Sequence, residues 1–115
     1  MSSLNELEKA VLQEMLRQAT ADQSSLKEQL TEASALSRDN TGSGFYTRLQ
    51  PKLIAKPVGA GTIGNVFADI NGLNHPMTFV LFIRDGVVDT LEGAATDDST
   101  TGIDFSRVQF KIRQA

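Results

Sequence analysis

A chain of 115 residues with no cysteine has room for one domain with a single modest core, and it excludes disulfides and thiolate chemistry. Its 11 Lys and Arg against 14 Asp and Glu give a net charge of -3, which disfavours phosphate backbones and anionic lipid as partners. With 40% apolar and 22% charged residues, the composition is that of a soluble folded protein rather than a disordered one. We expect one domain over residues 1–115.

The protein is expected to be cytoplasmic and bacterial. Its N-terminus carries acidic residues from Glu6 onward and lacks the basic flank and apolar run of a signal peptide. The longest apolar run, Met77–Ile83, falls far short of the roughly 20 residues that a membrane-spanning helix needs. We therefore expect neither a membrane nor a nucleic acid as partner.

A first helix is predicted near the N-terminus. Ser3, followed three residues later by Glu6, matches a capping box, in which each side chain bonds the backbone amide of the other residue. An apolar stripe with helical spacing comes next and consists of Leu4, Leu7, Val11, Leu12, Met15 and Leu16. This stripe needs a partner surface within the fold.

A second helix is predicted to follow. It begins at Asp22, or at Ser25 with Glu28, and it ends near the sequence "SRDNTG". Its apolar face is marked by Leu26, Leu30, Ala33 and Leu36. Residues 1–40 are therefore interpreted as a helical hairpin.

From Gly42 onward the apolar residues alternate with polar ones, which is typical of antiparallel strands. Strands are expected at 44–50, 65–70, 77–84, 87–93 and 104–112. The alternating sets of the first strand are Phe45, Thr47 and Leu49, and Tyr46, Arg48 and Gln50. One set is expected to face the core and the other to face away. Residues 42–113 are thus interpreted as an antiparallel sheet of four to five strands.

Two features organise the predicted sheet. The strand Met77–Arg84 is apolar on both faces, which favours a central position with a cover or an oligomer partner on its second face. Asp85 and Gly86 follow it and favour a type I′ hairpin, because both central residues of that turn need positive φ. Helices followed by strands indicate the α+β class, so we expect the helical hairpin to lie on one face of the sheet.

Several chemistries are disfavoured. Gly59, Gly61 and Gly64 have the G-x-G-x-x-G spacing of dinucleotide-binding loops, but that motif must lead into a helix and a strand is predicted here. His75 is the single histidine, so one chain has no multi-histidine metal site or proton relay. We expect no cofactor, no metal and no catalytic residue, which favours a non-enzymatic protein.

The segment "NTGSGFYTRL" supplies most of the candidate binding residues. Tyr46 and Arg48 share one face of a strand, and exposed Tyr and Arg are favoured at binding hot spots. The alternative is that Gly42 and Gly44 only provide backbone freedom between two elements. With Glu92 from a later strand, the candidate set is Thr41, Gly42, Gly44, Tyr46, Arg48 and Glu92.

Two segments resemble a family of uncharacterised small bacterial proteins. The segment "NTGSGFYTRL" is similar to the family pattern T-G-x-G-F-[FY]-T, and "FVLFIRDGVVDTLEG" is similar to F-V-L-F-x-x-D-G followed by L-E-G. The matching residues are Thr41, Gly42, Gly44, Phe45, Tyr46, Thr47, Asp85, Gly86, Leu91, Glu92 and Gly93. The resemblance implies no established activity. After L-E-G the family continues with aromatic and Trp-Pro residues, whereas this chain continues with "AATDDSTTG".

The leading hypothesis is a protein–protein interaction module that binds a protein partner, or a second copy of itself as a homodimer, through the exposed face or the edge of the sheet. An immunity or antitoxin-like inhibitor is one specialisation within this class, suggested by size and charge. The competing hypothesis is a small-molecule-binding protein or enzyme with a pocket between helices and sheet that uses Tyr46, Arg48 and Glu92.

Overall fold

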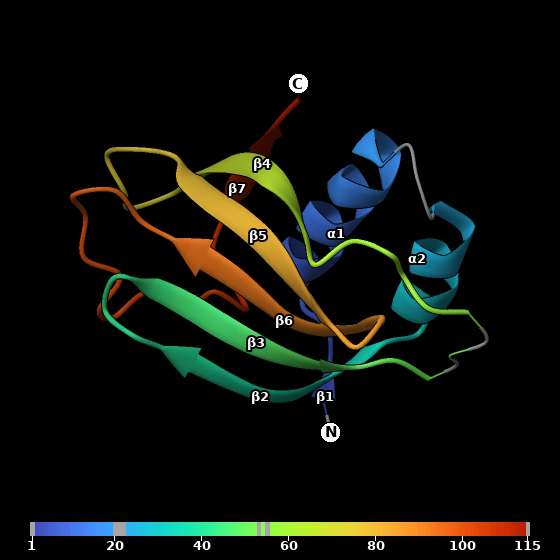
Figure 1. Ribbon diagram of the computed structural model, residues 1–115. Coiled ribbons are helices and arrows are strands. Elements are labelled where there is room, and N and C mark those ends of the chain that lie inside the picture. Colours follow the sequence, from blue (N-terminus) through green and yellow to red (C-terminus); the bar gives the residue numbers. More distant parts are fainter. Residues whose placement is uncertain (1, 20–22, 53, 55, 115) are drawn as a thin grey trace.

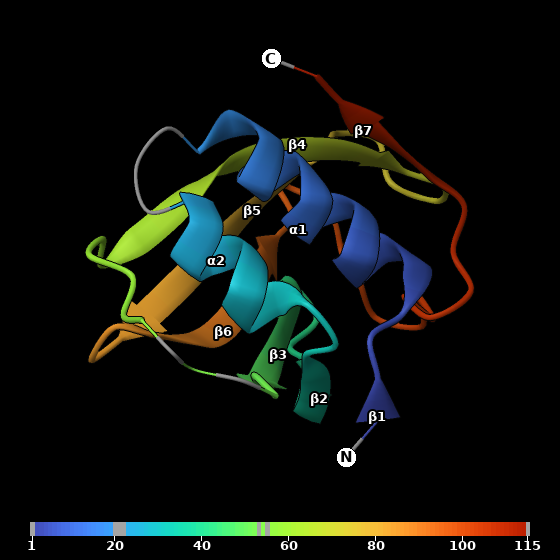
Figure 2. The same ribbon diagram turned by 90° about the vertical axis from the view of Figure 1, so that its right-hand side faces the viewer.

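The computed structural model describes residues 2–19, 23–52, 54 and 56–114, and in this part of the chain two helices cover one face of a sheet (Figures 1 and 2). The elements are β1 (Ser2–Ser3), α1 (Glu6–Gln18), α2 (Gln23–Leu30), β2 (Ser34–Asn40), β3 (Gly44–Gln50), β4 (Thr62–Ile70), β5 (Met77–Arg84), β6 (Val87–Ala94) and β7 (Phe110–Arg113). The expected α+β class is confirmed.

The sheet of the described residues has seven strands in the order β1-β2-β3-β6-β5-β4-β7. All neighbouring strands are antiparallel. The prediction of four to five strands was therefore too low, because β1 and β2 come from residues that were assigned to the helical hairpin. β6 holds the middle position, and β5, the strand expected at the centre, lies beside it with a partner on each edge.

The prediction of a helical hairpin over residues 1–40 was not confirmed, because α1 and α2 do not form a clear hairpin and residues 34–40 form a strand. After α2 the backbone of Glu32 adopts a positive φ of 57°, which a right-handed helix cannot contain, and the chain enters β2. Leu36, expected on the apolar helix face, lies instead at a bulge of β2 and is 47% exposed. Of the two predicted helix starts, Asp22 is outside the described residues and Ser25 lies inside α2.

The capping box of α1 is formed by Asn5 and Glu8, not by the predicted Ser3 and Glu6. The Glu8 amide donates to Asn5 Oδ1 at 2.8 Å, and the Asn5 amide donates to Glu8 Oε1 at 2.8 Å. Asn caps a helix as well as Ser does, so two overlapping signals were present. Ser3 is used in β1, where it pairs with Ser34.

The side chains of β3 alternate between the two faces of the sheet, as predicted. Phe45, Thr47 and Leu49 are buried under the helices, as are Val66, Ala68 and Ile70 of β4. The turn between β5 and β6 has φ values of 51° at Asp85 and 78° at Gly86, as a type I′ hairpin requires. The last strand is shorter than expected, since β7 contains only the end of the range 104–112 and pairs with β4 alone.

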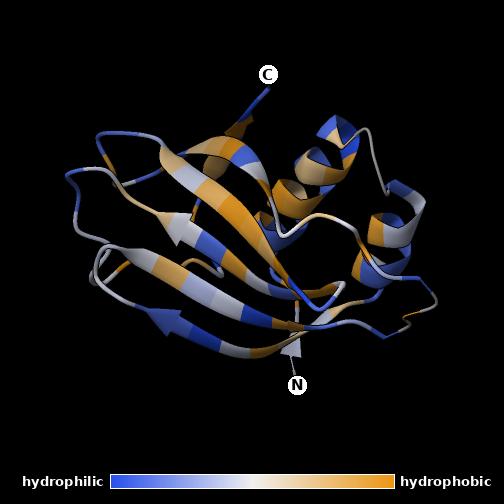
Figure 3. Cartoon of the chain, in the orientation of Figure 1, coloured by the Kyte–Doolittle hydropathy of each residue, from blue (hydrophilic) through white to orange (hydrophobic). Residues whose placement is uncertain are grey.

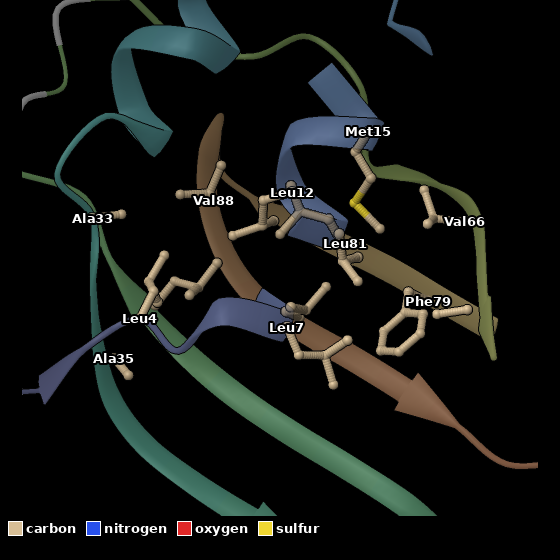
Figure 4. Packing of buried hydrophobic residues seen from close by; sticks show 14 of the residues in the cluster. Leu4, Leu7, Leu12, Met15, Ala33, Ala35, Val66, Phe79, Leu81 and Val88 are labelled. Carbon is tan, nitrogen blue, oxygen red and sulfur yellow. The ribbon is translucent and has the colours of Figure 1, made fainter. Parts of the chain in front are cut away.

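The core fills the space between α1 and the inner face of the sheet (Figure 4). The stripe of α1 contributes Leu7, Val11, Leu12 and Met15, each at most 4% exposed. These side chains meet Val66, Phe79, Leu81 and Val88 from β4, β5 and β6. The helix is therefore the cover that the apolar inner face of the sheet needs.

Two buried polar side chains tie the helices to particular strands. Glu8 of α1 accepts hydrogen bonds from Thr47 Oγ1 at 2.6 Å and from Arg38 Nε at 2.9 Å. Burial raises the pKa of Glu8, but the hydrogen bonds from Arg38, Thr47 and the Asn5 amide outweigh it, so the pKa lies below its usual value. These bonds hold α1 over β2 and β3.

Gln29 of α2 makes the equivalent tie to the β5–β6 hairpin. Its side-chain amide donates to the carbonyl of Gly86 at 2.9 Å and to that of Lys56 at 3.1 Å, and its oxygen accepts from the Val88 amide at 2.8 Å. Gln29 is fully buried. The single side chain therefore satisfies three backbone groups beneath α2.

Candidate functional site

The side of the sheet opposite the helices, here called the open face, carries three of the six candidate residues. Tyr46 on β3 lies opposite Glu92 on β6, and Arg48 lies opposite Thr90 one step further along. The guanidinium of Arg48 is 3.7 Å from the carboxylate of Asp89, which reaches this face at a bulge of β6. Tyr46 is 43% exposed.

Two phenylalanines share the open face with Tyr46, and sequence reasoning had not assigned them. Phe82 of β5 is 38% exposed and Phe67 of β4 is 42% exposed. Strand pairing places Phe82 beside Thr90 and Phe67 beside Thr78. Figure 3 shows β5 as hydrophobic along most of its length, whereas β2 ends in hydrophilic residues.

The signal for these residues was present in the sequence. β5 is apolar at nearly every position, and Phe79 and Leu81 are fully buried on its inner side. Strand alternation then places Val80 and Phe82 on the other side. The expectation that this strand is apolar on both faces therefore already implied that Val80 and Phe82 lie on the open face.

The other three candidate residues do not lie on the open face. They belong to the turn that joins β2 to β3, and they are Thr41, Gly42 and Gly44. The Thr41 amide donates to the Gly44 carbonyl at 3.0 Å, and the Thr100 amide donates to the Gly42 carbonyl at 2.9 Å. The buried Thr100 hydroxyl also accepts from the Gly44 amide at 3.0 Å. Thr100 belongs to the polar segment "AATDDSTTG", which therefore packs on this turn.

Gly44 is required by a close approach of two backbones. Its φ is +146°, and a Cβ atom added there would lie 2.0 Å from the carbonyl oxygen of Gly93. A Cβ on Gly93 would in turn lie 2.8 Å from the rings of Phe45 and Phe79. These contacts favour the structural alternative for Gly44, which was to supply backbone freedom.

The structure has a groove of about 600 Å³ between the helices and the start of β2. Its apolar lining comes from Leu4, Leu12, Leu16, Leu30 and Ala33, and Lys9 and Lys27 also line it. Tyr46, Arg48 and Glu92 are not among its lining residues, because they lie on the opposite face of the sheet. The prediction that these three residues line a pocket between helices and sheet was therefore wrong.

The glycine motif does not lead into a helix. Gly64 lies inside β4, and a Cβ there would be 3.3 Å from the carbonyl oxygen of Phe79 on the neighbouring strand. Gly61 precedes the strand and its carbonyl accepts a hydrogen bond from the Ile83 amide at 2.8 Å. The motif therefore leads into a strand, as expected, but its last glycine lies within β4 rather than before it.

His75 lies in the turn before β5 and is joined to Asp98. The Asp98 carboxylate accepts from the backbone amides of Asn74 at 3.1 Å and His75 at 3.0 Å, and it lies 3.3 Å from His75 Nδ1. Burial raises the pKa of Asp98, but the hydrogen bonds from His75 and Asn74 lower it by more, so the pKa lies below its usual value. The pair links two loops at one end of the sheet.

Within the described ranges there is no group of three or more His, Asp or Glu side chains that could hold a metal ion. Neither described helix has the length and apolarity needed to cross a membrane. No protein-family model, no curated protein and no solved structure matches this chain. The resemblance of its two glycine-containing segments to a bacterial family therefore stays a prediction.

Proposed function

We propose that this chain is a non-enzymatic interaction domain that binds a protein partner with its open face. The observation that carries the proposal is the presence of three exposed aromatic rings, those of Tyr46, Phe67 and Phe82, on the side of the sheet that the helices leave uncovered. Arg48 lies on the same face of β3 as Tyr46, two residues further along the strand. Tyr, Phe and Arg are enriched in the buried centres of protein interfaces, and gathered apolar side chains on a surface mark such sites.

The proposal is tested by photo-crosslinking in the native cells. A photoreactive phenylalanine analogue replaces Phe82 on the open face, and in a control chain it replaces Glu6, which is 83% exposed on the helical side. We expect protein adducts from position 82 and few or none from position 6. Equal adducts from both positions, or none from position 82, would contradict the proposal.

A second candidate function, small-molecule binding, is favoured by the groove between the two helices. Leu12 and Leu16 supply an apolar wall and Lys27 supplies a cation, which suits an amphiphilic carboxylate. A thermal-shift series with fatty acids of increasing length tests it, with Leu16→Trp as the variant that fills the groove. A rise in Tm that the variant abolishes would support this function, and an unchanged Tm at all chain lengths would exclude these ligands.

An immunity or antitoxin-like role is a specialisation of the first proposal. It is supported by the short chain and the net charge of -3. A gene for a toxic protein next to the gene for this chain would favour it. The cytoplasmic location and the bacterial origin belong to the same proposal.

A further inference from the structure

The charges of the open face are divided between its two halves. The half formed by β2, β3 and β6 carries three acids and one base, namely Asp39, Asp89, Glu92 and Arg48. The half formed by β5, β4 and β7 carries three bases and one acid, namely Arg84, Lys111, Arg113 and Asp69. One half is thus acidic and the other basic to the same extent.

Ion pairs within each half neutralise part of this charge. Arg48 is 3.7 Å from Asp89 in the acidic half. Arg113 is 2.9 Å from Asp69 in the basic half, and the hydrogen bond from this guanidinium lowers the pKa of Asp69. The four remaining residues take part in none of the ion pairs that join the described residues. They are Asp39 and Glu92 on one side, and Arg84 and Lys111 on the other.

A surface with this charge pattern is complementary to itself. A two-fold axis that runs parallel to the strands, between β6 and β5, lays the acidic half of one copy over the basic half of the other. Both copies then use the same patch, as an isologous dimer requires. Two sheets that stack in this way lie about 10 Å apart with their strands within about 30° of each other.

The apolar residues of the face occupy the middle of that arrangement. These residues are Tyr46 of β3, Val80 and Phe82 of β5, and Phe67 of β4, and their strands lie on both sides of the axis. The five strands from β2 to β4, spaced about 4.8 Å apart and about 25 Å long, cover roughly 600 Å² before side-chain relief is added. A stable interface buries about 800 Å² on each partner, and the face reaches that size only with the relief of its side chains and the additional strand β7.

We infer that the partner of the open face is a second copy of this chain, packed sheet to sheet about this two-fold axis. This inference rests on the proposed function, because it assigns a partner to the same face. The self-complementary charges are the observation that favours a second copy over an unrelated protein. The aromatic residues supply the apolar centre, and the opposite net charges of the two halves favour this orientation of the two copies.

Charge-reversed variants test the arrangement by sedimentation analysis across a range of protein concentrations. One variant carries Asp39→Lys and Glu92→Lys, and the other carries Arg84→Glu and Lys111→Glu. Each variant alone gives both halves of the face the same sign of charge, so we expect its dimer to dissociate at least tenfold more readily than the wild-type dimer. In an equal mixture the reversed halves complement each other, so we expect a heterodimer to form.

The outcomes separate this inference from the proposed function. Circular dichroism of each variant confirms that its fold is intact, since the four residues are exposed or half-exposed. A wild-type chain that is monomeric at every concentration, or a mixture that fails to restore the dimer, would overturn the inference. If position 82 then still captures a different protein, the proposed function stands without the homodimer. If position 82 captures nothing and the wild type is monomeric, both fail.

Discussion

At the scale of single residues, the most demanding position is Gly44. Its backbone lies against Gly93 of the adjacent strand, and its φ of +146° is one that side chains with a Cβ rarely adopt. Both the space and the backbone conformation therefore require glycine there. Gly61 differs in both respects, because an added Cβ would meet nothing within 4 Å.

Replacement of Gly44 by alanine is predicted to reduce the free energy of unfolding by about 3 kcal/mol or more, from strain and steric overlap together. The matched control is Gly61→Ala, which should change it by less than about 1 kcal/mol in either direction. Urea denaturation measures both. A Gly44→Ala chain as stable as the control would show that the two backbones do not approach so closely.

Glu8 is the second residue with a testable role, because its carboxylate is buried with Arg38 and Thr47. Replacement by glutamine removes the charge that compensates Arg38, and we expect the free energy of unfolding to fall by about 2–4 kcal/mol. Glu6→Gln is the control, since the Glu6 side chain is 83% exposed, and its effect should stay within about 0.5 kcal/mol. Equal effects of the two substitutions would contradict this assignment.

The same carboxylate predicts how stability depends on pH. The pKa of Glu8 is lowered from 4.5 in the folded chain, so its contribution is complete above that value and is lost as the pH falls through the folded pKa. Glu14, whose pKa the hydrogen bonds from Arg17 and Gln18 lower to about 2, acts in the same direction. We expect the urea midpoint to fall steadily from about pH 5 to pH 2, and to fall less in the Glu8→Gln chain. A midpoint that rose on acidification would contradict the sign.

At the scale of elements, Gln29 joins α2 to the β5–β6 hairpin through three hydrogen bonds to backbone groups. Gln29→Leu keeps a similar volume but removes all three hydrogen bonds, and only the Gly86 carbonyl keeps a second one, from the Val58 amide, so we expect a loss of about 2–4 kcal/mol. Hydrogen exchange should also become faster at the Val88 amide. The exposed Gln13→Leu on α1 is the control and should change neither quantity. Unchanged protection of Val88 would show that α2 is held by apolar contacts alone.

The elements also show what the sequence could predict. Segments with regular alternation, such as those of β3 and β4, were identified as strands because one side of each must be buried. β2 was missed because its inner face holds Ala35 and Arg38 instead of large apolar residues, and a bulge at Leu36 interrupts the alternation. Arg38 belongs inside only because Glu8 of a distant helix neutralises it, and no local pattern contains that information.

At the scale of the whole molecule, the order of the strands could not be predicted, because it depends on pairings between segments that are far apart in the chain. The candidate site depended on the same information. Tyr46 and Arg48 were placed together correctly from their spacing on one strand. Their apolar neighbours Phe67 and Phe82 come from strands whose positions only the sheet order reveals. Whether these residues line a pocket or an exposed surface depends on which side of the sheet the helices cover, and the sequence pattern does not contain that information.

The two layers predict how the molecule responds to truncation. Four side chains of α1, those of Leu7, Val11, Leu12 and Met15, contribute about 1.5–3 kcal/mol each by burial, which together rivals the 5–15 kcal/mol of a typical domain. A chain without residues 1–19 should therefore lose cooperative thermal unfolding and bind a hydrophobic dye. Removal of residues 1–3 alone should leave a cooperative transition, because β1 pairs only two residues. A sharp transition in the shorter chain would contradict the role of α1 as the cover.

The approach of Gly44 to Gly93 has a consequence for the evolution of this chain. One glycine belongs to the T-G-S-G-F segment and the other to the L-E-G segment, and they meet in adjacent strands although they are far apart in sequence. Gly44 excludes a Cβ because of the Gly93 backbone, and Gly93 excludes one because of the Phe45 and Phe79 rings, so relatives should retain each glycine for its own reason. Conservation of these two short segments would therefore reflect the packing of β3 against β6. The exposed aromatic residues take no part in that packing, so they can change together with the partner that they contact.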